Sequence, residues 1–241
     1  MKRFFRFILL LVLLAVGWHV YQNDIIPREK VFELAATSVP DWVDQQIINV
    51  DGDSRRGVYL ESVKDIVIHY VGNPDSTAQQ NRDYYANPSS EVSSHFVIGL
   101  KGEIIQCIPL HEKSSASNQR NKDTISIEVC HPDESGKFTD ASYQSLVKLT
   151  AWLCEVCDLD SGDIIRHYDI TRKQCPLYFV VHEDEWKKFK EDVAFNLKQH
   201  TQNATKSGCK AKKQPILVAF FVLYAILTIE VNGVCRKITQ H

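Results

Sequence analysis

The segment His167–Pro176 (HYDITRKQCP), taken together with His69 far upstream, is the feature that most constrains the fold of this 241-residue chain. Two imidazoles and one thiolate are the protein ligands that a catalytic zinc needs, with the fourth position left to water. A structural zinc site is usually closed by four ligands, and the sequence offers no convincing fourth. The fold therefore has to bring His69, His167 and Cys175 together, and this set favours hydrolysis by a metal-activated water over a binding module.

The composition is that of one globular domain with additional terminal segments. The formal net charge of −2 gives no argument for nucleic acid as a partner. Seven cysteines cannot all pair, and most of them lie among apolar residues, where small buried side chains are expected. Cys154 and Cys157 form a C-x-x-C pattern inside a helix with apolar periodicity, which favours core packing over a redox or metal-binding pair.

The N-terminal end has a basic start, Met1-Lys2-Arg3, followed by an apolar run that reaches Trp18. These are the parts of a signal sequence, so residues 1–21 are predicted to be a signal-anchor or a signal peptide. The segment Ala15-Val16-Gly17 offers a cleavage site, but the run continues into Trp18 without a polar break, which favours an uncleaved anchor. In both cases the basic end stays in the cytoplasm and the remainder is exported, as a membrane-anchored or a secreted protein.

The segments that flank the predicted domain are polar. Residues 22–40 are predicted to be a linker, residues 41–198 the globular domain, and residues 199–214 a second linker that is rich in lysine. The uniformly apolar residues 215–231 are a candidate second membrane segment, followed by a tail at 232–241. The positive-inside tendency argues against a second span, because that span would leave the lysines outside. A hydrophobic strand or helix docked on the domain is the alternative.

Strands and helices alternate within the predicted domain. Short apolar runs rich in β-branched residues predict strands, and longer runs with helical periodicity and an N-terminal cap predict helices. The predicted strands are 65–70, 124–130 and 163–167, with a hairpin that turns at Lys101-Gly102, and the predicted helices are 77–86, 139–157 and 183–197. This order predicts a mixed α/β fold, with a central mixed sheet flanked by helices.

Four motifs carry a resemblance to a known family. They are Ile66-Val-Ile-His69-Tyr70, Ser94-His95-Phe-Val-Ile98, Ser126-Ile-Glu128 and Arg166–Pro176. In this order and with this spacing they resemble the type 2 N-acetylmuramoyl-L-alanine amidases, a superfamily that also contains phage lysozyme-type amidases and peptidoglycan recognition proteins. The resemblance covers roughly residues 40–198. It implies a mixed central sheet surrounded by helices, with a zinc site in a groove on one side.

The resemblance also implies a role for each site residue. His69, His167 and Cys175 match the family's zinc ligands, with one zinc ion per domain. Glu128 matches the glutamate that handles the attacking water, and Lys173 matches the lysine near the substrate carbonyl. Some members have aspartate in place of the cysteine, and the non-catalytic recognition proteins lack a complete ligand set, so the presence of Cys175 favours an enzyme.

The residues around the hairpin depart from some relatives. Some phage members have a tyrosine directly before the histidine of the hairpin strand, where this chain has Ser94. A tyrosine role is therefore not supported, Glu128 is the better base, and His95 is expected to pack or hydrogen-bond near the site without binding metal. Three further candidates for substrate contact, which the sequence alone does not establish, are Tyr70, Asn118 and Arg120.

Each site residue also has an ordinary structural interpretation. His69 alone resembles a satisfied core histidine, Glu128 a solvent-facing strand carboxylate and Lys173 a loop lysine, but the joint set favours a zinc hydrolase. The expected activity is hydrolysis of the amide bond between N-acetylmuramic acid and L-alanine in peptidoglycan, by an enzyme that reaches the membrane through its terminal apolar segments. A non-catalytic peptidoglycan-binding module of the same fold is the alternative.

Overall fold

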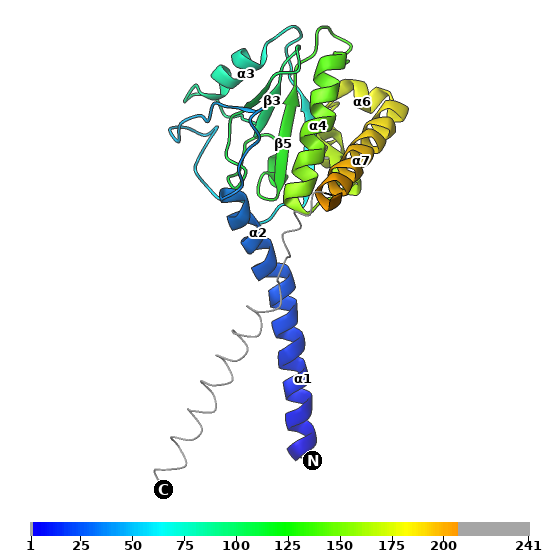
Figure 1. Cartoon of the computed structure of the whole chain (residues 1–241). Helices are drawn as coiled ribbons and strands as arrows, with labels where there is room; N and C mark the ends of the chain where they lie inside the picture. Colours follow the sequence, from blue (N-terminus) through cyan, green and yellow to red (C-terminus); the bar gives the residue numbers. More distant parts are fainter. Residues whose placement is uncertain (1, 207–241) are drawn as a thin grey trace. The chain divides into compact units, whose positions relative to one another are not determined.

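The computed structural model describes residues 2–206 of the chain (Figure 1). Its centre is a six-stranded sheet in the order β1-β4-β3-β5-β2-β6. The β3–β4 pair is antiparallel and each other neighbouring pair is parallel, which confirms the predicted mixed sheet. The strands are β1 Asp44–Gln45, β2 Asp65–Tyr70, β3 Phe96–Ile98, β4 Ile104–Gln106, β5 Thr124–Val129 and β6 Ile164–Arg166.

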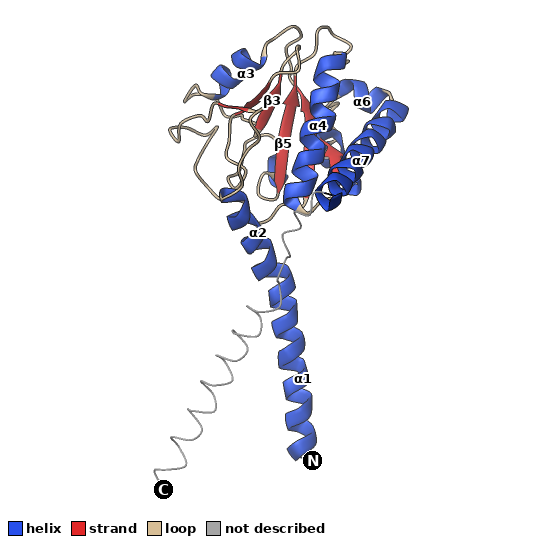
Figure 2. Cartoon of the chain, in the orientation of Figure 1, coloured by secondary structure: helices blue, strands red, loops and turns tan. Residues whose placement is uncertain are grey.

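Helices lie on both sides of this sheet, with α3 on one side and α4 and α7 on the other (Figure 2). A π-helical segment, η1 (Tyr21–Ile25), and two short 3-10 helices, η2 (Asn118–Arg120) and η3 (Ser161–Asp163), complete the described elements. The α-helices are α1 Lys2–Val20, α2 Ile26–Ala35, α3 Ala78–Tyr85, α4 Asp140–Cys157, α5 His167–Thr171, α6 Leu177–Val181 and α7 Glu183–Lys206.

The period of two along β5 decides what each face of the sheet carries. Ile125, Ile127 and Val129 are fully buried in the larger core cluster, which α4 and α7 complete. Glu128 alternates with these residues and therefore points to the opposite face. There α3 covers a smaller apolar cluster, to which it contributes Ala78. Glu128 thus lies on the face of the sheet that the shorter helix only partly covers.

The predicted helix starts and turns are found at the predicted residues. The Thr139 hydroxyl accepts a hydrogen bond from the Ser142 amide at 3.0 Å and begins α4. Thr77 and Gln80 form a reciprocal capping box at the start of α3. Gly102 turns the β3–β4 hairpin with φ of +82°, where a Cβ would lie 2.8 Å from the Ala141 carbonyl oxygen. These positions were predictable because capping and turn chemistry is local.

The prediction of a linker at residues 22–40 was wrong. Residues Phe4–Ala35 form one uninterrupted helical stretch, and Val31 and Leu34 are only 3% and 2% exposed because they pack into the larger core cluster. Lys30 also pairs with Asp158 at the end of α4, with 2.9 Å between Nζ and Oδ2. Val31 and Leu34, three positions apart on one face of α2, dock this helix on the domain, and the core therefore begins before residue 41.

The C-terminal part differs from prediction in one respect. Helix α7 continues to Lys206, past its predicted end near Leu197 and into the predicted lysine-rich linker. By its internal contacts the chain divides into two units, Met1–Gln199 and His200–His241. The candidate membrane segment at 215–231 and the tail at 232–241 lie outside the described residues.

The described residues contain one helix, Phe4–Ala35, that is long and apolar enough to cross a membrane. The side chains in its most apolar stretch are not buried by the rest of the protein. The predicted burial of the cysteines is confirmed for four of them, all without a disulfide: Cys107, Cys130, Cys154 and Cys157. Cys154 and Cys157 belong to the larger core cluster, as the helical periodicity predicted.

Candidate metal centre

Three neighbouring parallel strands deliver the first polar groups of the site. His69, near the end of β2, lies directly opposite Glu128 of β5 in the strand register. On the other side of β2, Ile68 pairs with Arg166, the last residue of β6, and His167 follows at once. Because parallel strands end at the same edge of a sheet, these side chains meet at one place. The strand that carries His69 and the strand that precedes His167 are therefore neighbours in the sheet.

The chain returns Cys175 to the same place after β6. His167 opens the short helix α5, which ends at Arg172 in the left-handed conformation with φ of +66°. The Tyr168 amide then donates a hydrogen bond to the Cys175 carbonyl oxygen at 2.9 Å. The start of α5 is held by Asp169, whose carboxylate accepts from the Arg166 amide at 2.8 Å and from its guanidinium at 3.0 Å. A tight, tethered loop thus fixes the cysteine beside the histidines.

His69, His167 and Cys175 form a compact donor cluster. Their ligand atoms all lie within 4.8 Å of one another, and all three residues are buried. The Cys175 Sγ is 3.9 Å from His69 Nδ1. Tetrahedral zinc with bonds of about 2.0–2.3 Å holds its nitrogen and sulfur donors about 3.3–3.7 Å apart. Two imidazoles and a thiolate at nearly this separation fit the chemistry of a zinc ion with one open position.

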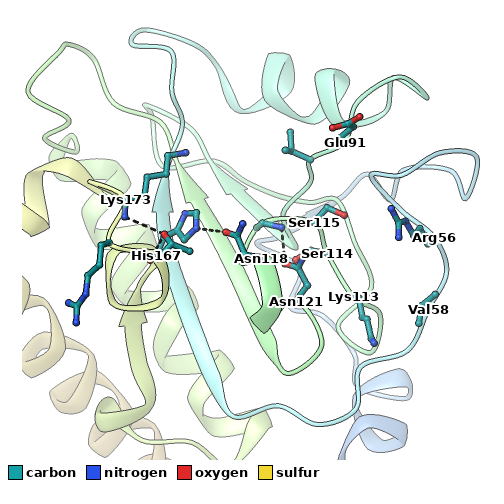
Figure 3. A pocket seen from close by; sticks show the side chains of 14 residues that line it. Arg56, Val58, Glu91, Lys113, Ser114, Ser115, Asn118, Asn121, His167 and Lys173 are labelled. Carbon is teal, nitrogen blue, oxygen red and sulfur yellow. Dashed lines mark hydrogen bonds between the residues drawn. The ribbon is translucent and has the colours of Figure 1, made fainter.

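The Nε2 atom of each histidine has a polar partner outside the donor cluster. His69 Nε2 lies 3.3 Å from the Ser117 hydroxyl, and His167 Nε2 lies 2.8 Å from the Asn118 side-chain oxygen (Figure 3). The sequence analysis did not single out Ser117, and it treated Asn118 only as a candidate for substrate contact. The one signal available was a polar stretch, Ser114–Asn121, between two apolar strands.

Burial determines the protonation of the candidate ligands. Desolvation lowers the pKa of His69 well below its usual value, with the positive charges of His167 and Lys173 acting in the same direction. Desolvation, and next Lys173, also lowers the pKa of His167. Both imidazoles are thus neutral at neutral pH, the form that binds metal. Burial, and next Glu128, raises the pKa of the Cys175 thiol to about 12, so metal binding has to displace its proton.

Glu128 lies beside the donor cluster without being part of it. Its Oε1 is 3.8 Å from His69 Nδ1, and its side chain is 17% exposed. The other oxygen, Oε2, is buried and has no hydrogen-bond partner among the described residues. Desolvation raises the pKa of this carboxyl to about 8, while the charge of Lys173 opposes the rise. A carboxyl with a free oxygen and a pKa near neutrality is suited to accepting and returning a proton.

The cluster lines the smaller of two adjoining cavities, and one of its residues, His167, also lines the larger one. Cavities of 990 Å³ and 710 Å³ share the lining residues Val92, Ser115, Ala116, His167 and Lys173, so they form one groove with two arms. We call the larger cavity the basic arm and the smaller one the amide–aromatic arm. The basic arm carries Arg56, Lys113, Arg172 and Lys173 against the single acid Glu91 (Figure 3). The amide–aromatic arm is lined among others by Tyr70, Asn73, Gln80, Asn81 and Tyr84.

A sequence model of the family described as N-acetylmuramoyl-L-alanine amidase matches residues 59–178, which include all five predicted site residues. This domain belongs to the type 2 N-acetylmuramoyl-L-alanine amidase family. The chain is 32% identical over 167 residues to the N-acetylmuramoyl-L-alanine amidase BlyA of Bacillus subtilis (strain 168), covering 61% of this chain and 45% of the relative. It is 28% identical over 183 residues to the N-acetylmuramoyl-L-alanine amidase CwlL of Bacillus licheniformis, covering 69% of this chain and 50% of that relative.

The chain thus spans about half the length of the curated relatives that it matches. Among solved structures, a mutant endolysin from Bacillus subtilis superposes with a TM-score of 0.56 at 24% sequence identity, covering 63% of this chain and 97% of that one. This likeness supports the mixed α/β fold of the amidase domain. It describes the architecture alone, because the sequence identity is low.

All five predicted site residues line the amide–aromatic arm, and two of them, His167 and Lys173, also line the basic arm; their roles stay predictions. His95 lies apart from the donor cluster. It is fully buried, with Nδ1 3.0 Å from the Ser126 hydroxyl and Nε2 2.9 Å from the Glu112 carbonyl oxygen. Arg120 binds Asp65 at the opposite end of β2 and is absent from the lining of both arms. Tyr70 does line the groove.

Proposed function

We propose that this chain is a zinc-dependent peptidoglycan amidase, which hydrolyses the amide bond between the lactyl group of N-acetylmuramic acid and L-alanine of the stem peptide. The observation that carries the proposal is the cluster of two neutral imidazoles and one thiol beside Glu128 and Lys173, at the centre of an open groove. The family membership and the names of the relatives support the same reaction class.

His69, His167 and Cys175 would hold the metal ion. When bound, zinc would supply a Lewis acid that polarises the scissile carbonyl and lowers the pKa of water toward about 7. The three residues leave one coordination position open, as a catalytic site requires. Their burial excludes bulk water from the protein side of the metal, which strengthens electrostatic interactions at the reacting carbonyl.

Glu128 is the proposed general base and acid. Its carboxylate, whose Oε1 lies 3.8 Å from His69 Nδ1, would accept the proton of the attacking water and return it to the departing amine of L-alanine. The raised pKa has a clear physical cause, since the carboxyl is desolvated between β2 and the groove. A nearby dication would lower that pKa and keep the group ionised until it takes up the proton.

Lys173 is the proposed stabiliser of the oxyanion. It lines both arms of the groove and is close enough to influence the pKa of His69, His167, Glu128 and Cys175. An ammonium group at this junction is able to donate a hydrogen bond to the oxygen that becomes negative when water adds to the carbonyl. The same side chain compensates the negative charge of Glu128 in the resting site.

The two arms would receive different halves of the substrate. Stem peptides carry free carboxylates, which fit the arm with four cationic side chains and one acidic one. The glycan is neutral in its hydroxyl-rich parts and fits the arm lined by amides and by Tyr84, a residue that is 58% exposed. We therefore infer that the peptide lies along the basic arm and the sugar along the amide–aromatic arm, with the scissile bond at Lys173.

The N-terminal helix would place the enzyme at its polymer. An apolar helix that begins near the N-terminus after a basic start is typical of a signal-anchor. With the basic end in the cytoplasm, the amidase domain would lie outside, where peptidoglycan is found. Because α2 continues from this helix and packs into the core, an uncleaved anchor would keep the domain close to the membrane.

The test is digestion of purified cell walls by the full chain in detergent, scored by new N-terminal alanine. The wild type, Cys175→Ser and a matched control, Cys130→Ser, are compared with zinc present. Cys130 is also buried but lies outside the donor cluster. Release by the wild type and Cys130→Ser, but not by Cys175→Ser, is expected. Wall binding without release by the zinc-loaded wild type would instead support the non-catalytic binding module.

A further inference from the structure

One short segment contacts the Nε2 atoms of both histidines of the donor cluster. Ser117 approaches His69 Nε2 at 3.3 Å, and the next residue, Asn118, approaches His167 Nε2 at 2.8 Å. Figure 3 shows the second of these contacts, with the side chain of Asn118, a lining residue of the basic arm, pointing toward the imidazole of His167. We call Ser117–Asn121 the positioning loop.

The chemistry of Asn118 makes its contact directional. A side-chain carbonyl oxygen accepts hydrogen bonds and does not donate them. His167 Nε2 must therefore carry the proton in this contact, which leaves the lone pair of the neutral ring on Nδ1. The Ser117 hydroxyl is able to accept or donate, so its contact orients the His69 ring without imposing one tautomer by itself.

The positioning loop is held by its own side chains. The Asn121 side-chain oxygen accepts hydrogen bonds from the backbone amides of Ala116 at 3.1 Å and Ser117 at 2.6 Å. Arg120 Nε donates to Asp123 at 2.7 Å, and its guanidinium also binds Asp65, the first residue of β2. The loop is thereby tied to the strand that carries His69.

The backbone of Asn118 points to the same role. Its φ of +53° lies in the left-handed region, which side chains other than glycine and asparagine rarely occupy. Here it lets two successive residues, Ser117 and Asn118, reach two different histidines.

We propose that the positioning loop prepares both histidines for zinc, with Asn118 as the residue that selects the Nε2–H tautomer of His167 and directs Nδ1 toward the metal. The proposal rests on the proposed zinc function. Asn118 is a positioning residue, since it acts through His167. Partners of this kind typically change metal affinity 10- to 100-fold, to order of magnitude, when they are lost.

Two substitutions separate the hydrogen bond from the backbone conformation. Asn118→Gly removes the acceptor but tolerates positive φ, so the loop geometry is kept. Asn118→Asp keeps an acceptor at the same place. Asn87→Gly is the matched control, since Asn87 is an exposed loop residue whose side-chain oxygen accepts a hydrogen bond from the Ser89 amide at 3.0 Å.

Two readouts are needed on the full chain in detergent. Zinc affinity is measured by competition with a chelator, and the ring nitrogens of His167 are observed by NMR of the zinc-free protein labelled with ¹⁵N-histidine. We expect Asn118→Gly to weaken zinc binding about 10- to 100-fold. In the zinc-free variant, the Nδ1–H tautomer of His167 should become populated beside the Nε2–H tautomer. Asn118→Asp and Asn87→Gly should bind zinc as tightly as the wild type and keep the tautomer.

The proposal is overturned if Asn118→Gly binds zinc as tightly as the wild type, if its tautomer is unchanged, or if Asn118→Asp loses affinity to the same extent. A wild-type chain that does not bind zinc would contradict the proposed function instead. The tautomer measurement distinguishes these cases, because it reports on the positioning loop in the absence of metal.

Discussion

The two arms of the groove differ in how they are built and in what they offer a substrate. The basic arm is formed by loops, from residues 56–58, 91–92, 113–121 and 171–173, and it gathers positive charge. The amide–aromatic arm is formed largely by α3 and the segment after β2, and it gathers amides and tyrosines. In the donor cluster, His69 lies near the end of β2, His167 directly follows β6, and Cys175 is held by the loop after α5. In the proposed function the residues on and next to the sheet would carry the chemistry, and the two arms, which differ in character, would select the substrate.

The largest expected effect comes from disabling the shared centre, which should affect every substrate equally. Glu128→Gln removes the proton acceptor and should lower kcat by about 10²–10⁴-fold, with little change in KM, because general acid–base catalysis contributes that much. The measurement is the rate of alanine release from soluble muramyl peptides. Glu185→Gln on α7 is the control. A strong rise in KM instead would show that Glu128 binds substrate rather than moving a proton.

The next effect concerns Lys173, which lines both arms. Lys173→Met should lower kcat by about 10²–10³-fold, the usual loss when one oxyanion donor is removed. Zinc affinity should not fall, because Lys173 is not a proposed ligand. Lys101→Met, on the exposed β3–β4 turn, serves as the control. Unchanged kcat in Lys173→Met would remove this residue from the catalytic centre and leave it as part of the basic arm.

A smaller effect is expected within the basic arm. Arg172→Ala should raise KM about tenfold for substrates with a carboxylate-bearing stem, since a charge-assisted hydrogen bond in a partly exposed groove contributes on the order of 1–2 kcal/mol. The rise should shrink at high salt and with amidated stems. Lys190→Ala is the control, because Arg172 and Lys190 lie over the rings of Tyr168 and Trp186 at 5.3 and 5.8 Å. If the wild type and Arg172→Ala each showed the same KM for amidated and for free stems, the assignment of the peptide to this arm would be refuted.

The smallest effect is expected in the amide–aromatic arm. Tyr84→Ala should raise KM by roughly threefold for substrates that retain the glycan, because stacking of an exposed ring on a sugar buries little apolar area. Substrates with a truncated glycan should show no difference. Tyr59→Ala provides the control, as Tyr59 is similarly exposed, at 49% against 58% for Tyr84, and lines neither arm. A Tyr84 effect that depends on the peptide instead would reverse the assignment of the two arms.

Local patterns in the sequence predicted most of the fold. The apolar, β-branched run at 65–70, the alternation along 124–130, the threonine caps and the Lys101-Gly102 turn each depend on nearby residues, and each was found. The linker at 22–40 was mispredicted because its helix is stabilised by packing on α4, through Val31 and Leu34, and not by its own polar sequence. Tertiary packing of this kind has no local signature.

The candidate site was predictable for its donors and less so for their supports. His69, His167, Cys175, Glu128 and Lys173 have distinctive chemistry and lie in recognisable motifs. Ser117 and Asn118 support the histidines from a loop that is distant in sequence from both, and serine and asparagine are ordinary loop residues. The division of the groove into two arms likewise depends on how separate loops meet, which spacing along the chain does not encode.

The most direct test of the central claim is a zinc titration of the metal-free full chain, with alanine release from cell walls followed at each point. The account predicts that activity rises in proportion to zinc and reaches its maximum at one ion per chain, and that Cys175→Ser remains inactive throughout. Full activity of the wild type without added metal, in the presence of a strong chelator, would contradict it.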